Sequence, residues 1–268
     1  LVRETGRATN PVAPGDLVHL ALLDHNRGVI ERIERRRNSF GRKAAGERPG
    51  EQVIAANVDQ IVIVFAAAEP AFRARGLDRY LAVAEHSGIP SIVCLNKIDL
   101  VSPEDASNMA APYEEIGYRV LRTCARTGQG VDELKVVLAS GISLVVGPSG
   151  VGKSSLLNAV EPGIGLATGE VGQTTHRGRH TTTASRLIPL TGGGFVADTA
   201  GMREFGLWEI SARDLASCFR EMRPYIGKCR FSDCAHISEP GCAVREAVES
   251  GSIRRSRYEH YVKLMRGG

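Results

Sequence analysis

Residues 144–155, with the sequence LVVGPSGVGKSS, constrain the fold of this chain more than any other stretch. Gly147, Gly152, Lys153 and Ser154 have the spacing of a phosphate-binding P-loop, in which two glycines precede lysine and serine or threonine. Glycines let backbone N–H groups converge on phosphate oxygens at the start of a helix. The stretch therefore predicts a buried strand, a tight loop, a helix and a bound nucleoside triphosphate.

The predicted phosphate-binding residues occupy this loop and the first turn of the helix after it. We expect Lys153 to neutralise the β and γ phosphates as a catalytic cation, and the Ser154 hydroxyl to ligate Mg²⁺. A glycine-rich turn with one solvated lysine is the alternative, but it does not account for the strand and helix on either side. The full set is Gly147, Ser149, Gly150, Val151, Gly152, Lys153, Ser154 and Ser155.

Apolar strands alternate with helical stretches between residues 59 and 197, which predicts a parallel sheet covered by helices on both faces. We place strands at residues 60–67, 91–95, 119–124, 143–146, 185–190 and 194–197. We place helices at residues 76–87, 103–116, 131–139 and 152–159. Motifs then follow the strand ends, as in open sheets that bind nucleotides.

The last of these strands is followed by Asp198, Thr199, Ala200 and Gly201. In nucleotide hydrolases such an aspartate helps to hold Mg²⁺, and the glycine N–H approaches the γ-phosphate without a side chain in the way. After a P-loop, the tetrapeptide predicts a second part of the same phosphate site.

The second strand leads into Asn96, Lys97, Ile98 and Asp99, which predict a guanine site. A carboxylate at Asp99 can accept hydrogen bonds from the N1 and N2 hydrogens of guanine, which adenine does not offer. After the third strand, the backbone at Cys124 and Ala125 can donate to the guanine O6. GTP and GDP are therefore the expected ligands, and Asn96 and Asp99 argue against an ATPase.

The guanine-binding elements precede the P-loop, whereas GTPases usually begin with the P-loop, so the chain is expected to be circularly permuted. Such a rearrangement is tolerated when the original termini lie close together and the new ones fall in exposed loops.

Three thiols and one imidazole lie within fourteen residues near the C-terminus: Cys229, Cys234, His236 and Cys242. In a chain with no export signal such a cluster more often holds zinc than disulfides, and four ligands suit a closed structural site. Buried, inert cysteines are the alternative. We expect the other cysteines, Cys94, Cys124 and Cys218, to lie in or near the core.

Residues 15–22 and 28–36 are expected to form short strands of a small β-barrel. The run 35–42 interleaves cations with Phe40, an arrangement typical of OB-folds that bind single-stranded nucleic acid. About fifty residues is short for a complete barrel, and because residue 1 is leucine we expect the natural chain to begin further upstream.

Taken together, these motifs resemble the ribosome small subunit-dependent GTPase A family of bacterial circularly permuted GTPases. The resemblance covers essentially the whole chain and rests on residues 96–99, 147–155, 178–183, 198–201 and the cysteine cluster. It implies an N-terminal OB-fold, incomplete here, at 1–50, a permuted α/β P-loop GTPase domain at 51–208, and a mostly helical zinc domain at 209–268. It also implies GTP hydrolysis stimulated by the small ribosomal subunit, late in the maturation of that subunit. Cys124 departs from the pattern, since serine is commoner there in GTPases.

The residue that orients the attacking water is expected to come from outside the aspartate-x-x-glycine element. Many GTPases place a glutamine directly after that element, but this chain has Met202, whose thioether cannot hold water strongly. His180 is the nearest candidate, with a merely solvated histidine as the alternative. In the same segment we prefer Thr182, over Thr181 or Thr183, as the Mg²⁺-binding switch threonine.

Both ends of the chain are basic and the middle is acidic. Residues 1–50 and 219–268 each carry 10 Lys/Arg against 6 Asp/Glu, whereas residues 51–218 carry 14 against 18. Basic ends indicate either contact with a polyanion such as RNA or ordinary solvated surface. Arg254, Arg255 and Arg257 are candidates for RNA phosphate contacts.

The apolar run 61–68 is too short to cross a membrane, so we expect a cytoplasmic protein. We also expect it to be a monomer. A GTP-dependent RNA-binding assembly module, in which hydrolysis is incidental, is the alternative to a GTPase.

Overall fold

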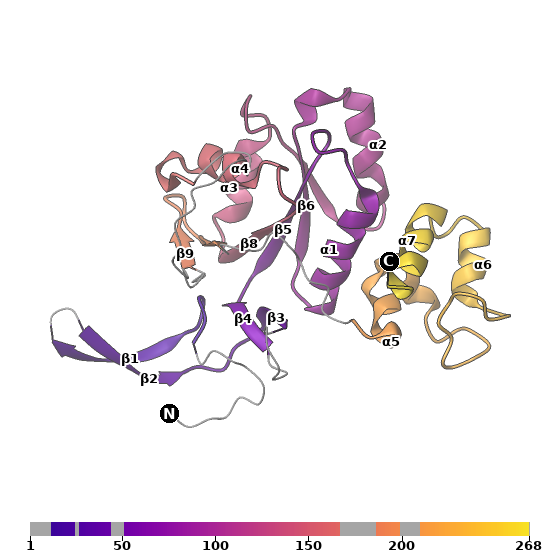
Figure 1. Cartoon of the computed structure of the whole chain (residues 1–268), viewed down its shortest axis with the longest axis horizontal. Helices are drawn as coiled ribbons and strands as arrows, with labels where there is room; N and C mark the ends of the chain where they lie inside the picture. Colours follow the sequence, from indigo (N-terminus) through magenta and orange to yellow (C-terminus); the bar gives the residue numbers. More distant parts are fainter. Residues whose placement is uncertain (1–11, 25–26, 44–50, 167–185, 199–209, 268) are drawn as a thin grey trace, which may run out of the picture.

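The computed structural model describes residues 12–24, 27–43, 51–166, 186–198 and 210–267 (Figure 1). The strands are β1 (Val18–Asp24), β2 (Arg27–Ile33), β3 (Ser39–Lys43), β4 (Glu51–Ala56), β5 (Gln60–Ala66), β6 (Ser91–Asn96), β7 (Arg119–Arg122), β8 (Ile142–Val146), β9 (Arg186–Pro189) and β10 (Phe195–Asp198). The α-helices are α1 (Ala74–His86), α2 (Pro103–Glu114), α3 (Val131–Leu138), α4 (Lys153–Val160), α5 (Ala212–Leu215), α6 (Ala243–Glu249) and α7 (Arg255–Met265). None of the described helices is long and apolar enough to span a membrane.

Six strands form the central sheet in the order β7-β6-β5-β8-β10-β9. The first five run parallel, as the alternation of strands and helices predicts. Strand β9 differs because it runs antiparallel to β10. A short turn from Leu190 to Gly194 joins these two strands, and a connection of that length can only reverse the chain direction.

Alternate residues of β5 build two cores, one on each face of the sheet. Ile61, Ile63 and Phe65 belong to a buried cluster with side chains of α1 and with Tyr113 of α2. Val62 and Val64 point to the other face, where the cluster is completed by side chains of α3 and α4. The strand is buried on both faces, which explains its continuous apolar sequence.

The N-terminal strands form two antiparallel hairpins, β1–β2 and β3–β4. The β1–β2 hairpin projects away from the sheet (Figure 1), whereas Phe40 of β3 is buried in the same core as β5. Phe40 therefore does not belong to an exposed nucleic-acid-binding surface, as expected for the run 35–42, since only 3% of its surface is exposed. Two of the neighbouring cations are engaged as well: Arg36 pairs with Asp16 at 2.7 Å and Arg37 with Asp59 at 2.8 Å.

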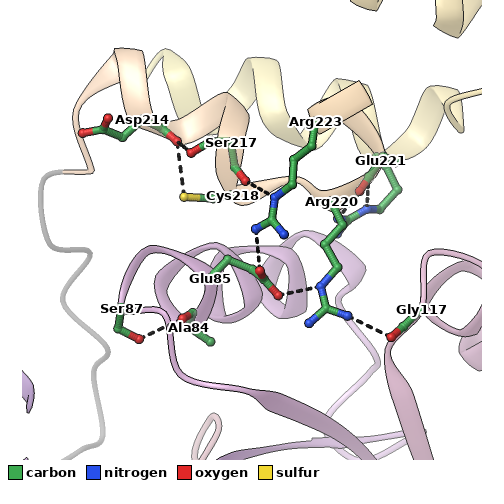
Figure 2. Close-up of polar contacts among 11 residues, drawn as sticks. Ala84, Glu85, Ser87, Gly117, Asp214, Ser217, Cys218, Arg220, Glu221 and Arg223 are labelled. Carbon is green, nitrogen blue, oxygen red and sulfur yellow. Dashed lines mark hydrogen bonds and ion pairs between the residues drawn. The ribbon is translucent and has the colours of Figure 1, made fainter. Parts of the chain in front are cut away.

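The C-terminal residues 210–267 have their own buried core, formed by α5, α6, α7 and the 3₁₀ turns between α5 and α6. This unit lies against α1 (Figure 1), and Figure 2 shows one of the contacts. Glu85 of α1 accepts hydrogen bonds from Arg220 and Arg223, at 2.7 and 2.5 Å. Arg220 also donates to the Gly117 carbonyl and lies 3.8 Å above the centre of the Tyr118 ring. The contact therefore combines ion pairing with packing.

A second, buried ion-pair cluster joins α7 to α1. Arg257 of α7, 3% exposed, pairs with Asp78 of α1 and with Glu221. The His260 Nδ1 donates to the Asp78 carboxylate at 2.5 Å. The expectation that Arg257 contacts RNA is therefore wrong, because its guanidinium is enclosed by carboxylates of the same chain. Arg254 is also paired, with Glu115 on the surface.

Replacing Asp78 by asparagine keeps the size of the side chain but removes the buried negative charge. We expect Asp78→Asn to lower the free energy of unfolding by about 3 kcal/mol, the low end of the cost of breaking a buried pair, because Glu221 remains beside Arg257. Glu115→Gln, which breaks an exposed pair, should cost less than about 1 kcal/mol. Denaturant unfolding followed by circular dichroism measures both, and equal costs would contradict a structural role for the buried pair.

Candidate nucleotide site and metal centre

The loop between β8 and α4 is held tightly against β5. At Gly147 the backbone is in the left-handed region, with φ +145°, and a Cβ placed there would lie 2.0 Å from the Val64 carbonyl oxygen. Gly152, at φ +92°, comes directly before the first residue of α4. A Cβ there would lie 2.4 Å from the amide nitrogen of Asn96. Both glycines of the predicted P-loop are thus required by the close approach of neighbouring chain segments.

The side chain of Lys153 folds back onto this loop. Its ammonium group donates to the carbonyls of Gly147 and Pro148, at 2.7 and 2.6 Å. Ser149 and Ser155 are exposed and Ser154 is half-buried, so their hydroxyl groups lie on the accessible side of the loop. The arrangement places one cation and several hydroxyl groups at the N-terminus of α4, where the helix dipole favours an anion.

Asn96 connects the end of β6 to this loop. Its amide nitrogen donates to the Val151 carbonyl at 2.9 Å, and its amide oxygen accepts from the Thr123 hydroxyl at 3.2 Å. Asn96 is 1% exposed and Thr123 is fully buried, so both hydrogen bonds are shielded from water. One side chain therefore fixes the ends of β6 and β7 relative to the P-loop.

Asp99 follows in the turn after β6, and both of its carboxylate oxygens have partners. The Cys124 thiol donates to one oxygen at 2.9 Å, and Arg126 donates to the other at 2.7 Å. These two donors hold the pKa of Asp99 below its usual range, so that the carboxylate is ionised at neutral pH. Each oxygen keeps further lone-pair capacity for another donor.

Lys97 lies between these two residues in an unusual backbone conformation. Its φ of +59° is in the left-handed region, which bulky residues rarely adopt. The ammonium group donates to the Glu69 carbonyl, at the end of the segment that follows β5. Its aliphatic chain passes close to Gly152, since a Cβ there would lie 3.8 Å from the Lys97 Cε.

The structure thus gathers most of the predicted nucleotide-binding residues at the carboxyl end of the parallel strands. Asp198 ends β10 at the same edge of the sheet, although its side chain lies outside the described atoms. His180, Thr182 and Gly201 lie outside the described residues.

The predicted zinc ligands also come together. The ligand atoms of Cys229, Cys234, His236 and Cys242 all lie within 4.8 Å of one another. The His236 Nδ1 is 3.4 Å from the Cys229 sulfur and 3.5 Å from the Cys242 sulfur. Tetrahedral zinc with bonds of about 2.1–2.3 Å separates its ligand atoms by about 3.4–3.8 Å. The donor set therefore fits a four-coordinate metal ion, and the two distances from His236 match the spacing that such an ion requires.

Known proteins are similar to this chain in both sequence and fold. A model of the RsgA GTPase family matches residues 33–208. A small ribosomal subunit biogenesis GTPase RsgA from Gemmatimonas aurantiaca is 49% identical over 236 residues, which are 88% of this chain and 77% of the relative. The chain belongs to the RsgA GTPase family. A relative of the same name from Moorella thermoacetica is 45% identical over 252 residues, covering 94% of this chain and 83% of that protein.

Two solved structures extend the likeness to the fold of this RsgA family member. YjeQ from Thermotoga maritima superposes with a TM-score of 0.78 at 35% identity, over 96% of this chain and 84% of that one. YloQ, described as a circularly permuted GTPase, superposes with a TM-score of 0.75 at 33% identity, over 97% and 82%. The order expected from the sequence, with the Asn96 motif at the end of β6 ahead of the loop that follows β8, agrees with the description of YloQ as circularly permuted.

The sequence did not predict three contacts that organise the site: those made by the side chains of Thr123 and Arg126 and by the backbone of Glu69. Thr123 and Arg126 flank the Cys124–Ala125 pair, and that adjacency was the available signal for them. Glu69 acts through its backbone carbonyl, and a side-chain pattern carries no information about such a contact.

Gly147→Ala should destabilise this RsgA family member, because a methyl group cannot fit beside the Val64 carbonyl and φ +145° is strained for alanine. We expect the free energy of unfolding to fall by about 1–3 kcal/mol from the backbone strain, and further from the close approach. Gly192→Ala is the matched control, since its nearest neighbour would be a flexible lysine atom at 3.8 Å. Thermal and denaturant unfolding measure both variants, and equal stabilities would disprove the close approach.

Proposed function

We propose that this chain hydrolyses GTP during maturation of the small ribosomal subunit, and that the subunit stimulates the hydrolysis. The relatives that it resembles over most of its length are named as biogenesis GTPases of that subunit. The observation that supports a guanine nucleotide most is the buried hydrogen bond from Asn96 to the Val151 carbonyl, which sets the Asp99 turn beside the P-loop.

In this proposal each part of the nucleotide has its own residues. Asp99, ionised and oriented by Cys124, accepts from N1 and N2 of guanine, and the backbone at Cys124 and Ala125 donates to O6. The backbone of residues 147–155 and the ammonium group of Lys153 hold the phosphates. A Mg²⁺ ion would be held by Ser154, Thr182 and Asp198 together with the phosphates.

Lys153 is the proposed electrostatic catalyst. Phosphoryl transfer depends mainly on positioning and on stabilising charge that spreads over the γ-phosphate oxygens. The ammonium group contacts the carbonyls of Gly147 and Pro148 in the loop that we propose for the phosphates, and this contact supports the assignment. We assign the orientation of the attacking water to His180, since Met202 cannot perform it.

Zinc is the metal that we propose for Cys229, Cys234, His236 and Cys242. The three thiolates and one imidazole match the ligands zinc prefers, and four protein ligands leave no position open for a substrate. The ion would therefore serve a structural purpose, as a link within the C-terminal unit. The same unit also carries exposed cations. Lys228, Arg230, Arg255, Lys263 and Arg266 are among them, and we propose these five as contacts to ribosomal RNA.

The N-terminal hairpins suit part of an OB-fold, the second proposed RNA-binding element. Both hairpins are antiparallel. Strand β1 exposes Leu20 and Leu22, at 58% and 82%, and the interior of a closed barrel would bury apolar side chains of this kind. We propose three parts, with the barrel at 1–50, the GTPase at 51–208 and the zinc domain at 209–268. The β3–β4 hairpin crosses the first of these boundaries.

GTP turnover measured with and without small ribosomal subunits tests the function directly. We expect strong stimulation by the subunit in the unmodified protein. His180→Ala should keep GTP affinity within a few-fold but lose the stimulated turnover, because the water is no longer oriented. Nucleotide-dependent binding to the subunit without stimulated turnover would instead support an assembly module in which hydrolysis is incidental.

Asp99→Asn tests the guanine assignment. The amide offers a donor where guanine also presents donors, so GTP affinity should fall by about 10⁴-fold while xanthosine triphosphate, which offers an acceptor, binds better. Asp132→Asn, on the exposed side of α3, is the control and should leave both affinities unchanged. Fluorescent nucleotide titration measures them, and unaltered selectivity in Asp99→Asn would refute the assignment.

A further inference from the structure

Glu239 lies in the segment between the metal-site residues His236 and Cys242, but it is not one of the clustered ligands. Its carboxylate accepts three backbone hydrogen bonds: from Ala235 at 2.8 Å, and from Ile237 and Ser238 at 2.9 Å. The donors lie on both sides of His236 in the sequence. One side chain therefore determines the path of the backbone that presents the histidine.

Charge strengthens this contact. Burial raises the pKa of Glu239, but the backbone N–H groups directed at the carboxylate outweigh burial and lower that pKa to about 2. The group is an anion at neutral pH, and hydrogen bonds to an ionised acceptor are about twice as strong as neutral ones. The same hydrogen bonds aim both carboxylate oxygens at the backbone.

Two tyrosines of α7 hold the same segment from its other side. Tyr261 donates to the Ala235 carbonyl at 2.7 Å, and Tyr258 donates to the His236 carbonyl at 2.8 Å. Tyr261 is fully buried and Tyr258 is half-buried. The N–H groups of Ala235, Ile237 and Ser238 and the carbonyls of Ala235 and His236 are thus bonded to side chains, in a stretch with no regular secondary structure.

The backbone needs such support because of His236 itself. Its φ of +59° is in the left-handed region, where a residue with a large side chain is held only if its surroundings over-determine it. That conformation brings the His236 Nδ1 within 3.5 Å of two cysteine sulfurs. A relaxed backbone would move the ring away from the thiols.

We propose that Glu239 is a positioning residue for the metal centre, which presets the left-handed turn at His236 so that the imidazole meets the three thiols before the ion binds. This inference rests on the proposed zinc site and adds to it a residue that contacts no metal. Tyr258 and Tyr261 complete the support, and they belong to the helix whose Arg257 and His260 contact Asp78 of α1. The metal segment is thereby attached to the helix that contacts α1, which in turn packs on the sheet.

The variant that tests this is Glu239→Gln, in the full chain. A carboxamide has one acceptor oxygen, and its NH₂ group would face a backbone N–H, so the variant loses part of the three-bond contact. We expect zinc affinity, measured by competition with a chromophoric chelator, to fall by about 10–100-fold, as for other residues that orient metal ligands. Glu249→Gln, on the exposed side of α6, is the matched control and should match the unmodified protein.

Two further readouts separate positioning from ligation and from misfolding. With saturating Co²⁺, Glu239→Gln should show the same thiolate-to-cobalt absorption as the unmodified protein, since all four ligands remain. Its GTP affinity should also be unchanged. Tyr258→Phe, which removes only one hydroxyl group, should weaken zinc binding in the same direction and keeps the test available if Glu239→Gln does not fold.

The outcomes distinguish this inference from the zinc proposal on which it rests. If the unmodified protein takes up no zinc, the zinc proposal fails and the inference fails with it. Suppose instead that the unmodified protein binds zinc and that the zinc affinities of Glu239→Gln and Tyr258→Phe lie within about threefold of its affinity. The zinc proposal then stands and the positioning role is overturned. A changed cobalt spectrum in Glu239→Gln would overturn it as well, because it would make Glu239 a ligand.

Discussion

The buried hydrogen bond between the Asn96 amide and the Val151 carbonyl is the contact on which the candidate nucleotide site depends. It joins two segments that are 55 residues apart in sequence. Because β6 and β8 both lie beside β5, their carboxyl ends are close enough for one side chain to span them. The turn that we propose for guanine and the loop that we propose for the phosphates therefore remain adjacent in space, whichever of them comes first in the chain.

Helix α1 has a comparable importance for the C-terminal unit. One side of this helix packs on the sheet, and the other presents Asp78 and Glu85 to arginines more than 130 residues later in the chain. Arg257 and His260 reach Asp78 from α7, the helix whose tyrosines also hold the metal segment. Helix α7 thus links the candidate metal centre to α1, and α1 packs on the GTPase sheet.

Much of the fold could be predicted because its signals are local. The apolar stretches at β5, β6 and β8 and the glycines around Lys153 fix strands and a loop through backbone sterics and burial, which act within a few residues. The motif order likewise gave the permuted topology, which the solved relative YloQ shares. The burial of Cys94, Cys124 and Cys218 is confirmed for the same reason, since each follows an apolar pattern.

The partners of charged side chains could not be predicted in this way. Arg257 and Phe40 read as RNA-contacting residues in the sequence, but the structure buries both, because carboxylates and apolar groups from distant segments surround them. The sequence by itself determined the strands of the central sheet, the glycine-rich loop before α4 and the four residues that cluster as candidate metal ligands. Only the tertiary structure decided which charges are enclosed and how Glu239 braces His236, since an ion pair or a backbone hydrogen bond depends on where the chain returns in space, not on the residues next to it.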